Sequence, residues 1–373
     1  MPKVLMVATS YPASGADWQG RFIFDMAESL ARVREFDLRL WAPPGTLPLG
    51  VTSALADGDA AWLSQLLKRG GIAHLLRRQP LRGGFHALNL LWRLRRLYRH
   101  FSGDGGQIVA HVNWIQNALP LAATNIPALI TVLGSDLALL KLPGMVQLVR
   151  RMLAGRRATL APNAEWMAAS LRENFGDLAE IRPIPFGVND RWFALNRNPD
   201  ACACNDWIVV SRITKAKLGH LLEWGEGLFG DTHRLHLLGP MQESLTLPNW
   251  IEYHGPTNPD TLSREWFPRA AGLLTLSIHD EGRPQVMMEA MAAGLPVIAS
   301  DLPAHRDLLR NGETGFLVDD ANCFATALAQ LDDPLLNCRI GLSARIWVAE
   351  HIGTWDDCAR RYVDAYDDLL RRL

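Results

Sequence analysis

The chain has 373 residues, of which 48% are hydrophobic and 21% charged, and its formal net charge is −1. This composition is typical of a globular protein, and the length predicts two domains of about 180 residues each. A net charge near zero argues against a nucleic-acid-binding protein. The lack of an apolar run of about 18 residues or more argues against a transmembrane helix.

The N-terminal sequence and the cysteines indicate where in the cell the protein is found. The stretch MPKVLMVATSYP is apolar over too short a length for a signal peptide, so we expect a strand and a turn there. No second cysteine pair stands at metal-ligand spacing from the first, so we expect reduced thiols, no bound metal and a cytoplasmic protein. The five cysteines are Cys202, Cys204, Cys323, Cys338 and Cys358.

Short apolar runs rich in Val, Ile and Leu alternate with helical patterns along the chain. They predict strands at 4–8, 38–42, 108–112, 128–133, 158–162, 181–185, 207–211, 234–239, 251–255, 272–277, 297–300 and 315–318. Strands separated by helices imply right-handed crossovers and parallel sheets. Gly, Asn, Pro and Asp cluster between 186 and 205. We therefore predict two doubly wound α/β domains, 1–188 and 189–354, followed by a helix over 355–373.

The segment from Ala60 to Gly103 contains no Asp or Glu. Its basic residues are Lys68, Arg69, Arg77, Arg78, Arg82, Arg93, Arg95, Arg96 and Arg99. At about 100° per residue, a helix over 88–101 places Leu90, Leu91, Leu94, Leu97, Tyr98 and Phe101 on one face, and Arg93, Arg95, Arg96, Arg99 and His100 on the other. We expect residues 68–100 to contact an anionic membrane surface. The alternative is a surface helix that covers the core of the first domain.

Residues 281–296 read EGRPQVMMEAMAAGLP and contain two carboxylates, Glu281 and Glu289. Pro284 suits the first turn of a helix, and Gly294 followed by a proline ends one, so we predict a helix over 285–293. Predicted strands lie on both sides of this loop and helix. Glu281 is thus expected at the carboxyl end of a strand, where open α/β sheets bind their ligands.

A second charged pair, Arg212 and Lys217, comes directly after the predicted strand 207–211. When a sugar–phosphate bond breaks, negative charge develops on the departing phosphate. Fixed cations beside that phosphate would stabilise the charge without a metal ion.

These segments resemble the GT4-type retaining glycosyltransferases, which have the GT-B fold. Residues 281–297 resemble the family's E-x7-E element, and VVSRITKAKLG resembles its GR-x(4)-KG element. TSYPASGADWQGRFIF, TVLGSD and PIPFGVNDRWF resemble three further family segments, so the likeness spans nearly the whole chain. It implies two Rossmann-like domains facing a cleft, with an N-terminal acceptor-binding domain and a C-terminal nucleotide-sugar-binding domain. In this family the last helix packs back on the first domain.

The resemblance also implies roles for individual residues. Arg212 and Lys217 would bind the donor diphosphate, and Glu289 would bind the ribose hydroxyls. Glu281 would contact the transferred sugar, helped by the residues that follow it. Asp136 is a candidate for holding an acceptor hydroxyl. The remaining positions expected to bind the donor are Gly15, Gly20, Gly282, Arg283 and Pro284.

The sequence departs from the family pattern at several places. Leu133 stands where the family often has a His that contacts the donor sugar, and His111, one strand earlier, is a candidate for projecting into the cleft. Asn189 replaces an Asp, and Lys-Leu-Gly replaces Lys-Gly after Arg212. Arg283 is unusual in its position and either contacts the sugar or acceptor or faces solvent. We interpret Asp57-Gly-Asp59, formally a metal-binding D-x-D, as a solvated loop, because no apolar strand precedes it.

The resemblance thus implies a retaining, metal-independent glycosyltransferase with a UDP- or GDP-linked sugar as donor and no other cofactor. With the basic segment, it suggests a lipid-linked or membrane-associated glycan acceptor, as in the synthesis of bacterial surface polysaccharides, at the inner face of the cell membrane. Two alternatives stay open. One is a GT-B sugar-nucleotide epimerase or hydrolase. The other, which Leu133 keeps open, is a catalytically silent subunit of a polysaccharide assembly complex.

Overall fold

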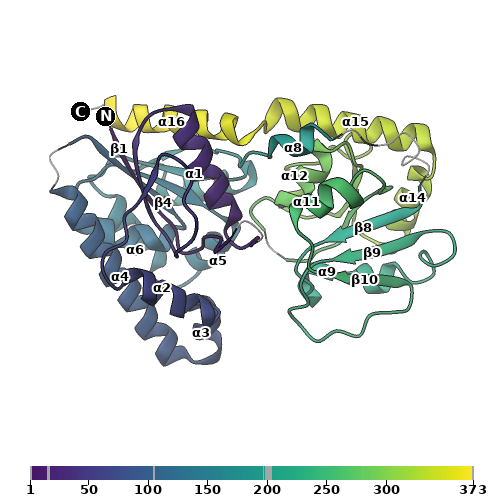
Figure 1. Ribbon diagram of the computed structural model, residues 1–373, viewed down its shortest axis with the longest axis horizontal. Coiled ribbons are helices and arrows are strands. Elements are labelled where there is room, and N and C mark those ends of the chain that lie inside the picture. Colours follow the sequence, from purple (N-terminus) through teal and green to yellow (C-terminus); the bar gives the residue numbers. More distant parts are fainter. Residues whose placement is uncertain are drawn as a thin grey trace. The chain divides into compact units, whose positions relative to one another are not determined.

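The computed structural model describes residues 2–14, 17–103, 106–195, 197, 204–279 and 281–371. The chain divides into two compact units, the first comprising residues 1–185 with 356–373 and the second residues 186–355. Each unit is built on its own parallel sheet (Figure 1).

The first unit contains a seven-stranded sheet of order β3-β2-β1-β4-β5-β6-β7. Its strands are β1 (Lys3–Val7), β2 (Asp37–Trp41), β3 (Val51–Ser53), β4 (Ile108–Asn113), β5 (Ala128–Val132), β6 (Ala158–Pro162) and β7 (Glu180–Ile181). Its helices are α1 (Arg21–Val33), α2 (Asp59–Lys68), α3 (Gly71–Arg78), α4 (Pro80–Ser102), α5 (Gly134–Leu140), α6 (Met145–Leu153), α7 (Ala168–Phe175) and α16 (Trp355–Arg371), with a 3₁₀ segment at Ile115–Ala123. The pairing is parallel throughout, as the alternation of strands and helices predicted.

Helix α16 belongs to the first unit although it is the last element of the chain. The hydroxyl of its Tyr366 lies 2.6 Å from His111 Nδ1, and the hydroxyl of its Tyr362 lies 3.2 Å from Thr131 Oγ1. Ion pairs join the helix surface to the same unit, among them Arg34 with Asp367 at 2.7 Å. These contacts tie the C-terminal segment to strands β4 and β5.

Helix α4 covers the core with the apolar face that the sequence pattern picked out. Leu94 and Tyr98 are fully buried there, together with Leu90, Leu97 and Phe101. The alternative that this helix covers the core of the first domain is therefore correct for this face, which packs on the first unit's sheet. Any membrane contact has to use another face of the helix.

The reading of Asp57-Gly-Asp59 as a solvated loop is wrong for Asp59, the first residue of α2. Its side chain is 2% exposed, accepts a hydrogen bond of 2.9 Å from Trp41 Nε1 and forms an ion pair with Arg93. Arg96 lies 3.5 Å from the same carboxylate. Arg93 of the basic segment is thus neutralised inside the fold, and Arg96 contacts the same carboxylate from the surface.

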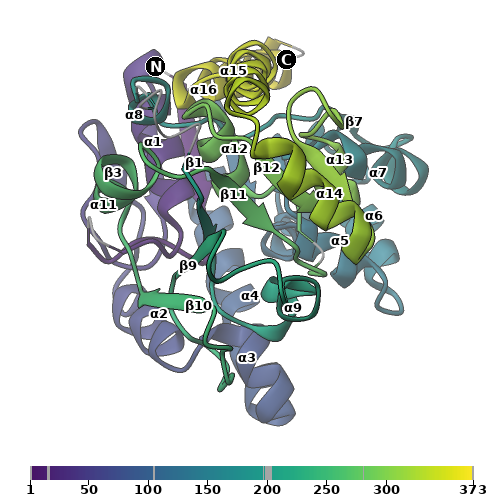
Figure 2. The ribbon, with the colours of Figure 1, turned by 90° about the vertical axis from the view of Figure 1, so that its right-hand side faces the viewer.

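The second unit contains a six-stranded parallel sheet of order β10-β9-β8-β11-β12-β13. Its strands are β8 (Asp206–Val210), β9 (Arg234–Leu238), β10 (Ile251–Gly255), β11 (Gly272–Thr275), β12 (Val297–Ser300) and β13 (Phe316–Val318). Its helices are α8 (Asp190–Phe193), α9 (Lys215–Leu218), α10 (Leu221–Trp224), α11 (Pro259–Thr261), α12 (Gln285–Ala292), α13 (Pro303–Arg306), α14 (Ala321–Leu331) and α15 (Pro334–His351). Helix α14 lies beside the sheet (Figure 2), and side chains of α14 and α15 pack on the sheet in the core of this unit.

Two further expectations concern the cysteines and the membrane. Cys204, Cys323 and Cys358 carry free thiols, whereas Cys338 is disulfide-bonded, so the expectation of reduced thiols is wrong for Cys338. Cys202 lies outside the described residues. Across the described ranges, no helix combines the length and the apolar character needed to cross a bilayer.

Candidate active site

The strand order of the second unit reverses between β8 and β11. From β8 the chain moves outward to β9 and β10, then returns to β11 on the other side. Ligands of open α/β sheets bind at such a switch point, outside the carboxyl ends of the strands. Arg212 lies just after β8, and Glu281 lies in the loop after β11, so both belong to this edge.

The loop after β8 is fastened to the loop after β11. The amide of Ile278 donates to the carbonyl of Ala216 at 2.9 Å. Gly219 has φ +54, and a Cβ there would lie 1.9 Å from the carbonyl oxygen of Leu276, so this approach requires glycine. Leu218, the additional residue of the Lys-Leu-Gly sequence, is 1% exposed and anchors the loop in the core.

Lys217 and Glu281, predicted from separate motifs, form an ion pair between Nζ and Oε1. Their side chains are 15% and 16% exposed, so the pair is largely withdrawn from water yet reachable at its edge. Arg212 is exposed, and its guanidinium has no hydrogen-bonding or ionic partner among the described residues. One cation is therefore held in place, and a second is available to an anion.

Arg283 does not face solvent. Its side chain is 6% exposed and forms an ion pair with Asp307, which is 13% exposed. The pair joins the loop before α12 to the segment after α13, so Arg283 orders this loop. Pro284 is buried and immediately precedes α12. Gly282, which lies between Glu281 and Arg283, is half-buried.

Glu289 lies on α12 and is half-buried, whereas the neighbouring Met287, Met288, Ala290 and Met291 are fully buried. The carboxylate thus stands at the margin of the buried face. This position allows an ionised carboxylate to keep water at one side and accept hydrogen bonds from a ligand at the other.

His305 is a candidate site residue that the sequence did not indicate. It lies in α13 directly after β12 and is fully buried. Its Nδ1 lies 2.6 Å from the carbonyl oxygen of Ser300, so Nδ1 donates and Nε2 carries the lone pair. Nε2 is buried without a partner among the described residues. Burial lowers the pKa of His305, while the charge of Glu281 raises it and that of Lys217 lowers it.

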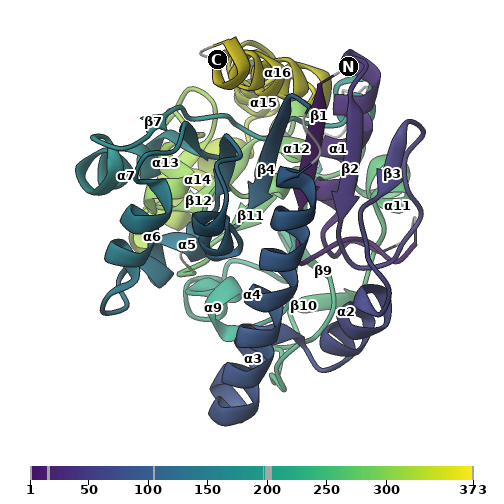
Figure 3. The ribbon, with the colours of Figure 1, turned by 90° about the vertical axis from the view of Figure 1, so that its left-hand side faces the viewer.

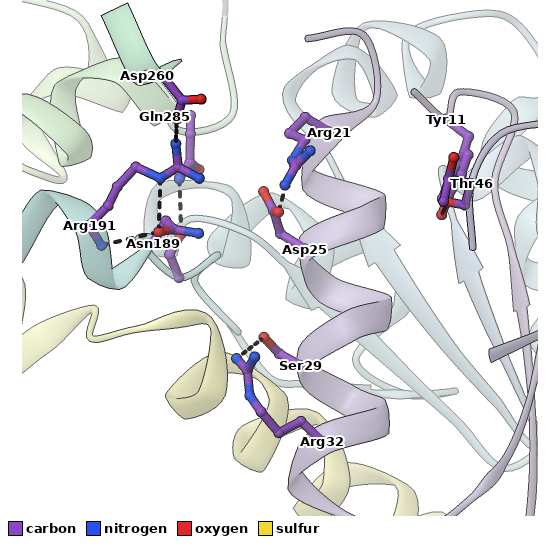
Figure 4. Close-up of polar contacts among 11 residues, drawn as sticks. Tyr11, Arg21, Asp25, Ser29, Arg32, Thr46, Asn189, Arg191, Asp260 and Gln285 are labelled. Carbon is purple, nitrogen blue, oxygen red and sulfur yellow. Dashed lines mark hydrogen bonds and ion pairs between the residues drawn. The ribbon is translucent and has the colours of Figure 1, made fainter. Parts of the chain in front are cut away.

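Asn189 explains how the chain tolerates the loss of the family's Asp. Its Oδ1 accepts hydrogen bonds from the backbone N (3.1 Å) and Nε (3.2 Å) of Arg191 and so caps helix α8 (Figure 4). Arg191 also pairs with Asp260 at 2.5 Å. An amide oxygen caps a helix as well as a carboxylate does, so the substitution keeps the local structure.

In the first unit, His111 and Asp136 point inward. His111 is fully buried, and its two ring nitrogens lie 2.6 Å from Tyr366 Oη and 2.8 Å from Thr131 Oγ1; burial lowers its pKa to about 3. Asp136 is 1% exposed and accepts a hydrogen bond of 2.8 Å from the amide of Leu133. Burial raises its pKa to about 7 against the opposing backbone hydrogen bonds of Leu133 and Ile115. Neither side chain presents an accessible atom, so we assign both a structural role.

The glycine-containing loop after β1 leads into α1. Gly20 is buried and immediately precedes α1, on which Arg21 pairs with Asp25 at 3.0 Å (Figure 4). Gly15 lies outside the described residues. Trp114, directly after β4, has φ +68 and is half-buried, and its ring lies 5.8 Å from that of Phe22. Such a backbone costs about 1–3 kcal/mol and is concentrated at functional sites, but no local sequence signal marks it.

Two groups of side chains among the described residues bring potential metal ligands within 4.8 Å of one another. One is His236, Glu252 and His254 on strands β9 and β10, and the other is Asp319, Asp320 and Cys323. Neither includes a residue of the expected donor site.

The sequence of the second unit matches known glycosyltransferases. Residues 209–333 match the family model described as glycosyl transferases group 1. D-inositol 3-phosphate glycosyltransferase of Streptomyces avermitilis is 34% identical over 130 residues, which cover 34% of this chain and 27% of that protein. Its counterpart in Streptomyces bingchenggensis is 34% identical over 150 residues, covering 39% and 31%. The match thus spans less than a third of the length of these curated relatives.

Solved structures resemble the whole chain. Sucrose-phosphate synthase of Thermosynechococcus elongatus has a TM-score of 0.75 at 16% identity and covers 100% of both chains. HepE of Anabaena, solved in complex with UDP-glucose, has a TM-score of 0.66 at 13% identity and covers 99% of this chain and 100% of its own. The chain therefore has the GT-B fold. Within the second unit, residues 209–333 are similar in sequence to the glycosyl transferases group 1 family, as the motifs around Arg212 and Glu281 predicted.

Proposed function

We propose that the protein is a retaining, metal-independent glycosyltransferase whose second unit binds a nucleotide-sugar. The observation that carries this proposal is the meeting of Lys217 with Glu281 at the switch point, beside the unpartnered Arg212. Cations and a carboxylate at one sheet edge match a donor that has an anionic diphosphate and a polyhydroxylated sugar. UDP-glucose bound to HepE supports a donor of this class.

In the proposed reaction, Arg212 and Lys217 hold the diphosphate, and Glu289 accepts hydrogen bonds from the ribose hydroxyls. The bond between the anomeric carbon and the phosphate oxygen breaks, and the acceptor oxygen bonds to the same face of that carbon. The acceptor proton passes to the departing phosphate oxygen. The two cations stabilise the negative charge that develops on the nucleoside diphosphate, which is the contribution expected of preorganised charges. Glu281 keeps Lys217 in position and contacts the sugar.

We further infer that the acceptor is a membrane-associated or lipid-linked glycan and that residues 68–100 bring the first unit to an anionic membrane surface. Side chains of this segment carry exposed positive charge, and no carboxylate among the described residues pairs with them. These are Lys68, Arg69, Arg77, Arg78, Arg82, Arg95 and Arg99. Arg93 does not take part, because it is largely buried and paired with Asp59.

A screen of UDP- and GDP-linked sugars for thermal stabilisation tests donor binding. A ligand at about 100 times its Kd stabilises the folded state by about 2.7 kcal/mol, so the true donor raises the melting temperature measurably. Arg212→Ala should lose most of this stabilisation. Arg264→Ala, which removes an exposed charge elsewhere in the second unit, should keep it. If no nucleotide-sugar stabilises the protein, or if both variants respond alike, the proposed donor site is wrong.

A further inference from the structure

Helices α3 and α4 form a hairpin that extends from the first unit on the side away from α16 (Figures 1 and 3). Gly83 allows the two helices to pack closely, because a Cβ there would lie 2.5 Å from the backbone N of Leu76. This close approach brings the last turn of α3 and the first turns of α4 together. The basic residues of both helices therefore border one surface.

A pocket of about 500 Å³ lies between these helices. Its lining contains Arg69, Arg78, Arg82, His74 and His86 and no carboxylate. A pocket with this lining concentrates positive potential, which an anion would neutralise.

Hydrogen bonds orient the arginine side chains of the pocket but do not neutralise their charge. Arg82 Nη1 donates to Gln79 Oε1 at 3.1 Å, and Arg69 Nη1 lies 3.2 Å from His86 Nε2. The other ring nitrogen of His86, Nδ1, is buried and has no hydrogen-bond partner among the described residues. Arg78 has no ionic partner among those residues either. A phosphate would supply the acceptors that the guanidinium groups lack, and their planar forks fit its oxygens.

An apolar stripe lies next to this pocket on α4. Leu81, Phe85, Leu88 and Trp92 are 92%, 65%, 69% and 58% exposed. Their spacing of four, three and four residues places them on one side of the helix, opposite the buried face that contains Leu90 and Leu94. Large apolar side chains gathered on one exposed face mark a contact with a membrane or another molecule.

We propose that the α3–α4 pocket binds the phosphate of an anionic lipid headgroup while the apolar stripe enters the same leaflet. The proposal rests on the membrane association inferred above and assigns it to a specific site. The positive pocket and the apolar stripe together match the two parts of such a lipid. Apolar faces of interfacial helices reach about 5–10 Å into the boundary between headgroups and acyl chains. A phosphate pocket beside the stripe then lies at headgroup depth.

Vesicle sedimentation tests the pocket, with vesicles of phosphatidylcholine alone or mixed with phosphatidic acid, whose headgroup is a phosphate monoester. Arg78→Ala with Arg82→Ala should weaken partition onto the mixed vesicles about 30-fold, given roughly fivefold per arginine near the headgroups. Arg95→Ala with Arg99→Ala changes the net charge equally but lies about 20 Å further along α4, beyond a Debye length of about 8 Å. This control removes only the long-range part of the attraction, to which Arg95 and Arg99 contribute outside the pocket, so it should lose less than about fivefold. Equal losses in the two double variants would overturn the pocket in favour of diffuse charge attraction.

A second pair of measurements separates a lipid from a free phosphate. Leu81→Ser with Phe85→Ser should lose vesicle capture but still bind inorganic phosphate in a calorimetric titration. Binding of inorganic phosphate by a wild-type protein that no vesicle captures would overturn the lipid assignment. All these side chains are exposed, so the variants should melt at the wild-type temperature. Stabilisation by the donor should also be unchanged, which keeps a failure here distinct from a failure of the proposed glycosyl transfer.

Discussion

Substitution of Lys217, which pairs with Glu281, separates a structural role of this lysine from a catalytic one. Lys217→Met removes the charge but keeps most of the unbranched side chain, and it leaves Glu281, 16% exposed, without its partner. Exposed pairs contribute about 0–1 kcal/mol, and breaking a buried pair costs about 3–5 kcal/mol. The pair of Lys217 and Glu281 is intermediate in exposure, so breaking it should lower the free energy of unfolding by about 2 kcal/mol. Turnover should fall about 10²–10³-fold, as for the loss of one preorganised charge.

The double variant, Lys217→Met with Glu281→Gln, provides the decisive comparison. It leaves no charge unpaired, so urea unfolding should show that at least half of the stability lost in the single variants returns. Turnover should stay low, because the diphosphate still lacks its cation. If turnover recovers together with stability, or if Lys217→Met binds nucleoside diphosphate as tightly as the wild type, the pair is only structural and the reasoning fails.

Three further predictions concern the carboxylates and the metal. Glu289→Gln should mainly weaken binding of the nucleoside diphosphate in calorimetry, because the ribose is bound alike in ground and transition states. Glu281→Gln should mainly lower turnover. Equal losses of affinity in the two variants would contradict this division. The pKa of Asp136 is raised from 3.8 to about 7, so its contribution to stability is fully present below pH 3.8 and is lost as the pH rises through 7. Asp136→Asn, which cannot ionise, should therefore gain stability relative to the wild type between pH 4 and 7, by up to about 1.4 kcal/mol per pH unit, and stability curves that stay parallel over this range would refute the shift. EDTA should leave turnover unchanged, and a loss restored by Mg²⁺ or Mn²⁺ would refute a metal-independent reaction.

The strands were predictable because those of a parallel sheet are buried on both faces and read as continuous apolar runs. Eleven of the twelve predicted strands overlap observed strands over most of their length, and the twelfth, 181–185, overlaps β7 at residue 181 alone. Strand β3 (Val51–Ser53) was not predicted, since three residues at a sheet edge with two exposed side chains give no such run. The helix carrying Glu289 was predicted to within one residue, because proline and glycine mark both of its ends.

The site was predictable only where motifs are local. Lys217 and Glu281 came from two separate motifs, and the structure joins them. Arg283 was misjudged because its partner, Asp307, lies in a later segment that no motif links to it. His111 was misjudged for the same reason, since the residue that covers it, Tyr366, lies at the far end of the chain.

Periodicity likewise identified α4 as amphipathic but did not show what each face contacts. The face with Leu94 is buried in the core, and the stripe with Phe85 is exposed. Both faces carry large apolar side chains, so hydrophobicity alone does not tell the buried face from the exposed one. The difference comes from tertiary packing, which a single sequence does not reveal.

The configuration of the transferred sugar tests the central claim most directly. With the donor identified by thermal stabilisation and a glycan acceptor supplied, NMR spectroscopy of the first product formed should reveal the anomeric configuration of the new bond. Retention of the donor's configuration, with transfer that depends on the acceptor and on Lys217, is the predicted result. An inverted product, or release of free sugar without transfer to any acceptor, would contradict a retaining glycosyltransferase.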